Sequence, residues 1–250
     1  MKKISALFKD IKLALLMMLP VYALAIATIF INLNENQSII ISDCIGNIIG
    51  LILCIFYLRK NQLSLTNKSV FLKPDLILLT LILLFQINWT LFSSQFFFAI
   101  FPNKEEETEI TFIQQVLAVV FAPIAEEIIF RFGMINLGKK YVSLFTASLF
   151  SIIIFVLVHF PDLPSFFAIF GIALVYSLVY NATHNLIYTI AAHMLNNLIS
   201  VLALHYSIFN KITDAKSVSD LNNPVFYISI AGIVLTSFIM VKRVKCFKSE

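Results

Sequence analysis

Charged side chains interrupt an apolar segment near the middle of this chain of 250 residues. Glu126, Glu127 and Arg131 stand among apolar residues in the segment 122–131. A charge held in membrane hydrocarbon is costly, so such residues are candidates for function. Glu127 and Arg131 are four positions apart in the acid-before-base order, which favours an ion pair on one face of a helix.

The two glutamates are expected to do different jobs, because Glu126 points about 100° away from Glu127 around an α-helix. Glu127 is paired with Arg131, and Glu126 then faces a cavity. A carboxylate in apolar surroundings titrates closer to neutrality than it does in water, and this behaviour suits a general base. We therefore expect Glu126 to be the reactive carboxylate.

Two further pairs of residues have the same four-residue spacing: Phe155 with His159, and His193 with Asn197. If Glu126 and His159 meet, they can polarise a water molecule between them. His193 and Asn197 can donate hydrogen bonds to the oxyanion that forms when this water attacks a carbonyl group. The residues thus outline a peptide hydrolase that uses no covalent nucleophile.

Each group also has a structural explanation. The two glutamates and the arginine could form an ion-pair cluster or part of a proton path. His159 stands one residue from a loop, as interfacial histidines do, and His193 with Asn197 could bond neighbouring helices. The occurrence of all three groups on three separate predicted helices favours the enzyme.

Transmembrane helices are the elements that must position these residues. The chain is 60% hydrophobic and 13% charged, whereas a soluble domain has about 25% charged residues. A membrane span needs about 20 mainly apolar residues. Eight segments meet this requirement: 12–32, 39–58, 75–101, 111–137, 141–160, 165–181, 185–209 and 224–241. We expect an all-α polytopic membrane protein, a bundle of about eight transmembrane helices.

The basic residues indicate the orientation of the helices. With the N-terminus in the cytoplasm, all 18 basic residues except Lys104, Arg131, Lys211 and Lys216 fall in cytoplasmic segments. The positive-inside rule therefore predicts eight spans with both termini in the cytoplasm. These residues stand at span ends, where topology alone requires them, so they do not indicate nucleic-acid binding. The three cysteines are odd in number and predict no disulfide framework.

The chain is expected to be organised in three parts. Residues 1–110 hold the first three transmembrane helices, residues 111–205 form the catalytic core, and residues 206–250 supply an outer loop, the last helix and a basic cytoplasmic tail. At 1.5 Å per residue from the cytoplasmic ends, His193 lies about 12 Å deep, Glu126 about 18 Å and His159 about 27 Å. His159 therefore joins the site only if its helix is tilted or its first turn lies in the membrane interface.

The three motifs resemble those of the CPBP family of intramembrane glutamic endopeptidases. This family includes the CAAX prenyl proteases and the bacterial Abi proteins linked to bacteriocin self-immunity. The motifs are matched in order: EExxxR by Glu126, Glu127 and Arg131, FxxxH by Phe155 and His159, and HxxxN by His193 and Asn197. The resemblance covers roughly residues 112–200, and the chain departs from the pattern at Val175, where a small residue often follows the glycine at position 171.

The resemblance implies a role for each motif residue. It implies that Glu126 and His159 activate water, that His193 and Asn197 form the oxyanion site, and that Glu127 with Arg131 orients the first pair. It also implies that no cofactor is needed. Zinc held by Glu126, His159 and His193 is the alternative, and the absence of a helical HExxH pair argues against it.

The expected partners are membrane lipid and a peptide or protein substrate, in a bacterial plasma membrane. The alternative function is a non-proteolytic immunity or regulatory protein of the Abi type. A small-solute carrier is a third option, although no inverted repeat supports it.

Overall fold

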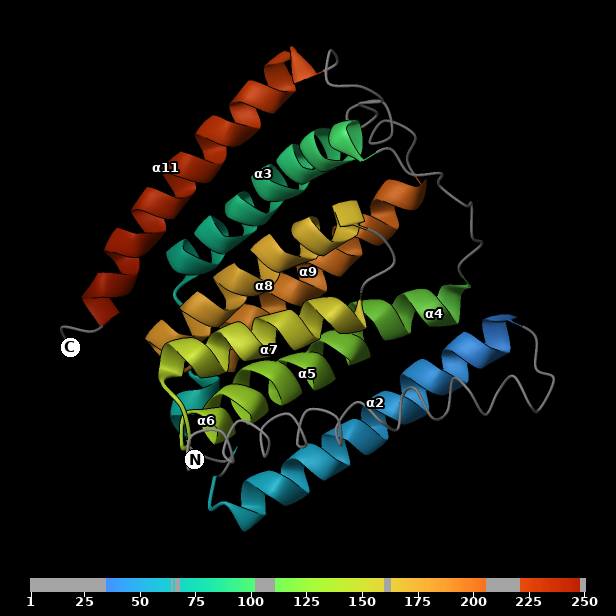
Figure 1. Ribbon diagram of the computed structural model, residues 1–250, viewed down its shortest axis with the longest axis vertical. Helices are drawn as coiled ribbons and strands as arrows, with labels where there is room; N and C mark the ends of the chain where they lie inside the picture. The colour runs from blue at the N-terminus through green and yellow to red at the C-terminus, as the bar shows by residue number, and fades with distance from the viewer. Residues whose placement is uncertain are drawn as a thin grey trace. The chain divides into compact units, whose positions relative to one another are not determined.

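The computed structural model describes residues 35–63, 65, 68–101, 111–159, 163–205 and 221–247 (Figure 1). Within these ranges the regular elements are helices, and no β-strand occurs. This confirms the predicted all-α class. The predicted span 12–32 lies outside the described residues, so the total of eight spans stays a prediction.

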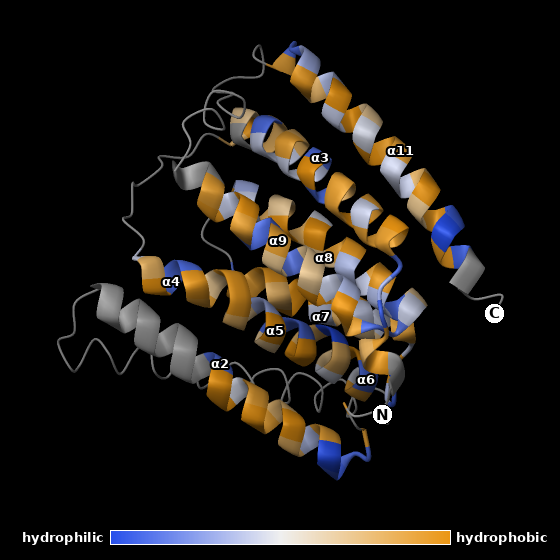
Figure 2. Ribbon diagram, turned by 180° about the vertical axis from the view of Figure 1, so that it is seen from behind, coloured by the Kyte–Doolittle hydropathy of each residue, from blue (hydrophilic) through white to orange (hydrophobic). Residues whose placement is uncertain are grey.

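The long helices coincide with predicted spans. Their bounds are α2 Glu35–Lys60, α3 Leu76–Ile100, α7 Leu144–Val158, α8 Leu163–Thr183, α9 Leu186–His205 and α11 Pro224–Phe247. Among the described helices, α3, α8 and α11 are long and apolar enough to cross a membrane, and α7 and α9 contain shorter apolar stretches. Figure 2 shows hydrophobic residues along most of α11 and hydrophilic residues toward its C-terminal end. These are the helices expected of an all-α membrane protein.

The helix that leads to His159 begins later than the predicted boundary at Tyr141. Residues 139–141 form a turn, in which the Tyr141 N–H donates to the Gly138 carbonyl at 2.8 Å. Helix α7 begins at Leu144, because Ser143 precedes it and its hydroxyl accepts from the N–H of Thr146 at 3.1 Å. A side chain that satisfies an N–H of the first turn marks the start of a helix.

The described residues fall into two compact units. One is drawn from residues 1–71 and 108–154, and the other from residues 72–107 and 155–250. Helix α7 begins in the first unit and ends in the second. In the first unit, α2 packs against α5 and η3, which belong to the helical run described next.

The predicted span 111–137 is a single helical run that becomes π-helical twice. Its parts are α4 Phe112–Val116, the π-helix η2 Leu117–Phe121, α5 Ala122–Glu126, the π-helix η3 Glu127–Met134 and α6 Ile135–Gly138. The sequence predicts α-helical geometry throughout, so the π segments are a correction. Pro123 supplies one physical reason, because a proline inside an α-helix removes a hydrogen bond and clashes with the preceding turn. The wider turns of η2 lie directly before it, where the Ala122 N–H donates to the Leu117 carbonyl five residues back.

The second unit is built around α3, which contacts α8, α9 and α11; Figure 1 shows α3 lying beside α11 and α8. Its buried core draws apolar side chains from all four helices. They are Leu78, Leu81, Ile82, Phe85, Val175, Tyr176, Val179, Tyr188, Ala192 and Met240.

A glycine lets α3 and α8 approach closely. A Cβ atom at Gly171 would collide with the indole ring of Trp89. The Trp89 Nε1–H donates to the carbonyl of Ala168 at 2.8 Å, one turn before the glycine. The contact combines close packing with a hydrogen bond between helices, which is how helices associate in membranes.

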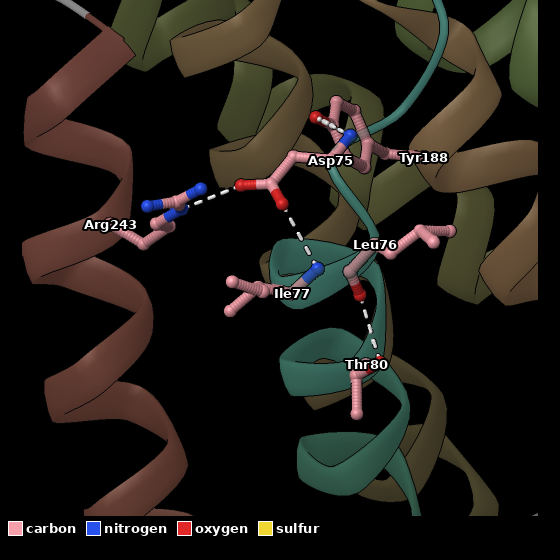
Figure 3. Close-up of polar contacts among 6 residues, drawn as sticks. All are labelled: Asp75, Leu76, Ile77, Thr80, Tyr188 and Arg243. Carbon is pink, nitrogen blue, oxygen red and sulfur yellow. Dashed lines mark hydrogen bonds and ion pairs between the residues drawn. The ribbon is translucent and has the colours of Figure 1, made fainter.

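Asp75 connects three helices at one end of the second unit (Figure 3). Its carboxylate accepts from the N–H of Ile77 at 3.0 Å and so caps α3. The same carboxylate lies 2.5 Å from the Nε of Arg243 on α11, and the Asp75 N–H donates to the hydroxyl of Tyr188 on α9 at 2.7 Å. The Arg243 guanidinium holds the pKa of Asp75 below its ordinary value of 3.8.

Replacing Asp75 with asparagine is expected to lower the free energy of unfolding by about 1 kcal/mol or less, because the Arg243 ion pair is partly exposed. Asparagine retains the cap, so Asp75→Ala should cost about 1 kcal/mol more. A carboxylate with a lowered pKa stabilises the fold above its unfolded pKa, and this contribution disappears as the pH falls through its folded pKa. The difference between wild type and Asp75→Asn, measured by denaturation in micelles, should therefore be full at neutral pH and shrink below pH 3.8. A difference that stayed constant down to that range would contradict this view of the pair.

Candidate active site

The predicted site residues belong to both units. Glu126, Glu127 and Arg131 lie in the first unit, on α5 and η3. The other motif residues lie in the second unit: Phe155, His159, His193 and Asn197.

The predicted ion pair is present. Glu127 Oε2 lies 3.4 Å from Arg131 Nε, and neither side chain has any exposed surface. An ion inside a protein loses its hydration, so each partner depends on the charge of the other. The pair therefore fixes η3 internally, as the four-residue spacing predicts.

Glu126 has a different environment from Glu127. It is the last residue of α5, its side chain is half-buried, and the π-helix begins at the next residue. Glu126 is partly exposed, whereas the Glu127 side chain is fully buried. The two glutamates thus differ in burial, and their different roles stay a prediction.

The local geometry of His159 determines which of its nitrogens can act as a base. Helix α7 ends at Val158, and the His159 N–H donates to the Val156 carbonyl at 3.1 Å. The His159 Nδ1 lies 2.8 Å from the carbonyl oxygen of Phe155. A carbonyl only accepts, so Nδ1 carries the proton and the lone pair of the neutral imidazole is on Nε2.

Phe155 contacts both histidines of the motifs. Its ring centroid lies 4.5 Å from that of His159 and 5.9 Å from that of His193. The phenylalanine of the FxxxH motif is buried, with 3% of its surface exposed. The structure thus brings the FxxxH and HxxxN motifs together around one aromatic ring.

His193 is packed from a second side by a residue that the sequence does not single out. The Tyr176 ring on α8 lies 5.6 Å from the His193 ring. The Nε2 of Gln86 on α3 lies 2.5 Å from the Tyr176 hydroxyl and 3.2 Å from the carbonyl of Ala192, the residue before His193. Gln86 thus bonds two neighbouring helices, α8 and α9, and no sequence motif marks Tyr176.

The start of α9 sets the position of His193 and Asn197. His184 ends α8 with a left-handed φ of 52°, a conformation in which histidine is several-fold enriched over most residues. Asn185 then caps α9, because its side-chain oxygen accepts from the N–H of Ile187 at 3.0 Å. The capped helix places Asn197 one turn after His193.

Asn197 is half-buried, and its amide oxygen lies 3.4 Å from the Nδ2 of Asn196. In this contact Asn196 donates and the Asn197 oxygen accepts, whereas the NH2 group of Asn197 is a hydrogen-bond donor. A donor is what the oxyanion hypothesis requires of this residue.

Comparison with known proteins agrees with the motifs. Residues 108–199 match the family model described as type II CAAX prenyl endopeptidase Rce1-like. The matched region contains all three motifs, from Glu126 to Asn197. No curated protein and no solved structure matched the chain. The segment 108–199 is therefore similar to the type II CAAX prenyl endopeptidases, the family that the motifs predict.

Proposed function

We propose that this protein is an intramembrane endopeptidase that hydrolyses a peptide bond of a membrane-associated protein or peptide. The observation that carries the proposal is the family match over residues 108–199, which contains every residue of the three motifs. The buried ion pair beside a half-buried carboxylate, and two histidines on one phenylalanine ring, support it.

The proposed reaction begins with a water molecule held between Glu126 and His159. A proton passes from the water to this pair, and the resulting hydroxide attacks the carbonyl carbon of the peptide bond. Nε2 of His159 suits this role, because the Nδ1 contact with Phe155 leaves its lone pair on Nε2. His193 and Asn197 donate hydrogen bonds to the tetrahedral oxyanion. The proton then moves to the amine nitrogen, the C–N bond breaks, and a carboxylic acid and an amine leave.

Glu127 and Arg131 have a supporting role in this proposal. They are sealed from solvent, so they do not exchange protons with substrate. Their ion pair stabilises the first turn of η3, which begins at the residue directly after Glu126. A rigid support of this kind is needed because a small misplacement of a reacting group costs a large part of the rate.

The substrate class follows from the family description and the membrane setting. The family name specifies a prenylated CAAX end, in which a lipid is attached to a cysteine near the C-terminus. We propose a bacterial plasma membrane with both termini in the cytoplasm, where peptide pheromones, bacteriocin leaders and membrane-protein tails are the corresponding substrates.

The test uses purified protein in liposomes with a farnesylated CAAX peptide that carries a quenched fluorophore, and with membrane peptides from the cell of origin. Mass spectrometry should find new peptide termini that are absent with Glu126→Ala. Cleavage should continue in EDTA, with no stoichiometric zinc by metal analysis. Loss of activity in EDTA and recovery with zinc would favour the zinc alternative, and equal products from wild type and Glu126→Ala would contradict the proposal.

A further inference from the structure

The π-helix η3 carries most of the EExxxR motif and is an unusual element. It spans eight residues, Glu127–Met134, and all of them are buried. π-helices are rare, mostly limited to a single turn, and frequent at functional sites. A π-helix of this length therefore calls for contacts that hold its backbone away from the α-helical arrangement.

Side chains bind the backbone of η3 at alternate carbonyl groups. The Sγ of Cys54 on α2 lies 3.9 Å from the carbonyl of Ile128. The Ser151 hydroxyl on α7 donates to the carbonyl of Phe130 at 2.7 Å, and the Nδ2 of Asn136 donates to the carbonyl of Phe132 at 2.8 Å. Thiols are weak donors, so Ser151 and Asn136 supply the strong bonds.

Of these two strong donors, Ser151 is the one that comes from another helix. Asn136 bonds four residues back along its own helical run, which restrains only local pitch. Ser151 is fully buried and binds a carbonyl 21 residues away in sequence. In apolar surroundings, a carbonyl that loses its donor is not compensated by water.

We propose that Ser151 is a positioning residue for the carboxylates of the EExxxR motif. Its hydroxyl donates to the carbonyl of Phe130, which lies between Glu127 and Arg131 in the sequence. This bond maintains the π-helical geometry of η3, which begins directly after Glu126, the last residue of α5. The predicted effect of Ser151 on kcat rests on the proposed function. The structural part of the inference, the dependence of η3 on the Ser151 hydroxyl, stands on the hydrogen bond alone.

A matched pair of variants isolates the hydroxyl. Ser151→Thr and Ser151→Val have nearly the same shape, and only threonine retains the donor. With the farnesylated CAAX peptide as probe, Ser151→Val and Ser151→Ala should lower kcat about tenfold to a hundredfold, with KM within about twofold, because the reacting groups are misplaced rather than lost. Ser151→Thr should retain most of the wild-type kcat.

Ser229→Ala is the control for removing a buried serine. Ser229 is also fully buried, but its hydroxyl donates to Phe226 of its own helix α11 at 2.7 Å. The kcat of Ser229→Ala should stay within about twofold of wild type, because the lost hydrogen bond lies within α11 and involves no residue of the EExxxR motif. A loss of activity as large as that of Ser151→Ala would assign the effect to general destabilisation and overturn the proposal.

Hydrogen–deuterium exchange provides a readout that does not depend on catalysis. Amides in residues 127–135 should exchange faster in Ser151→Val than in Ser151→Thr, and Ser229→Ala should leave them unchanged. Equal exchange and equal kcat for the threonine and valine variants would overturn the proposal. If wild type cleaves no probe, the proposed function fails, and the exchange comparison still decides whether Ser151 holds the π-helix.

Discussion

Replacing Glu126 with glutamine is expected to lower peptide cleavage by about 10²- to 10⁴-fold, which is the usual contribution of a general base. Glutamine has nearly the same shape as glutamate, but its amide group cannot act as a general base. The side chain is half-buried, and the substitution leaves the ion pair of Glu127 with Arg131 in place. The change therefore leaves no buried arginine without its partner, and the variant should insert and fold as wild type does.

The measurement is kcat with the farnesylated CAAX peptide in liposomes, together with the denaturation midpoint of each protein. Asp75→Asn is the matched control, since it makes the same carboxylate-to-amide change outside the motifs and should alter kcat less than twofold. Cleavage by Glu126→Gln at a rate close to that of wild type would remove Glu126 from the reaction.

Replacing Arg131 with methionine is expected to lower the free energy of unfolding by about 3–5 kcal/mol, because it leaves the Glu127 carboxylate buried without its countercharge. Both side chains of the pair are fully buried. The double variant Glu127→Leu with Arg131→Met should recover most of this loss, since a buried ion pair is often replaced by apolar residues without cost. Chemical denaturation in micelles measures all three free energies.

Arg243→Met gives the comparison for an arginine in an exposed pair. Its ion pair with Asp75 leaves 40% of the arginine side chain accessible, so the expected loss is about 1 kcal/mol or less. If Arg131→Met and Arg243→Met cost the same, burial does not govern the Glu127–Arg131 pair. If the double variant is as unstable as the single one, packing rather than charge explains the loss.

The features that the sequence predicts well depend on local spacing or on hydrophobic length. The lengths of apolar segments locate α3, α8, α9 and α11, because a membrane span has a nearly fixed size. The four-residue spacing predicts the ion pair of Glu127 with Arg131.

The features that the sequence does not predict depend on contacts between distant segments. The π-helical pitch of η3 has no local signal, because Pro123 acts on the preceding turn in η2, and one bond to η3 comes from Ser151 on α7. The FxxxH spacing marks Phe155 as a neighbour of His159 but does not indicate that its ring also touches His193. The contact between Tyr176 and His193 cannot be predicted from the sequence for the same reason, because the two residues are distant in sequence and meet only in the folded protein.

The proposed reaction requires that Glu126 and His159 bind the same water molecule. A cryo-electron microscopy structure of the protein in lipid nanodiscs, at a resolution that shows water, tests this claim most directly. We predict one water with a Glu126 carboxylate oxygen and the His159 Nε2 both about 2.6–3.2 Å away. Side chains of Glu126 and His159 directed to different surfaces, with no common water within reach of both, would contradict it.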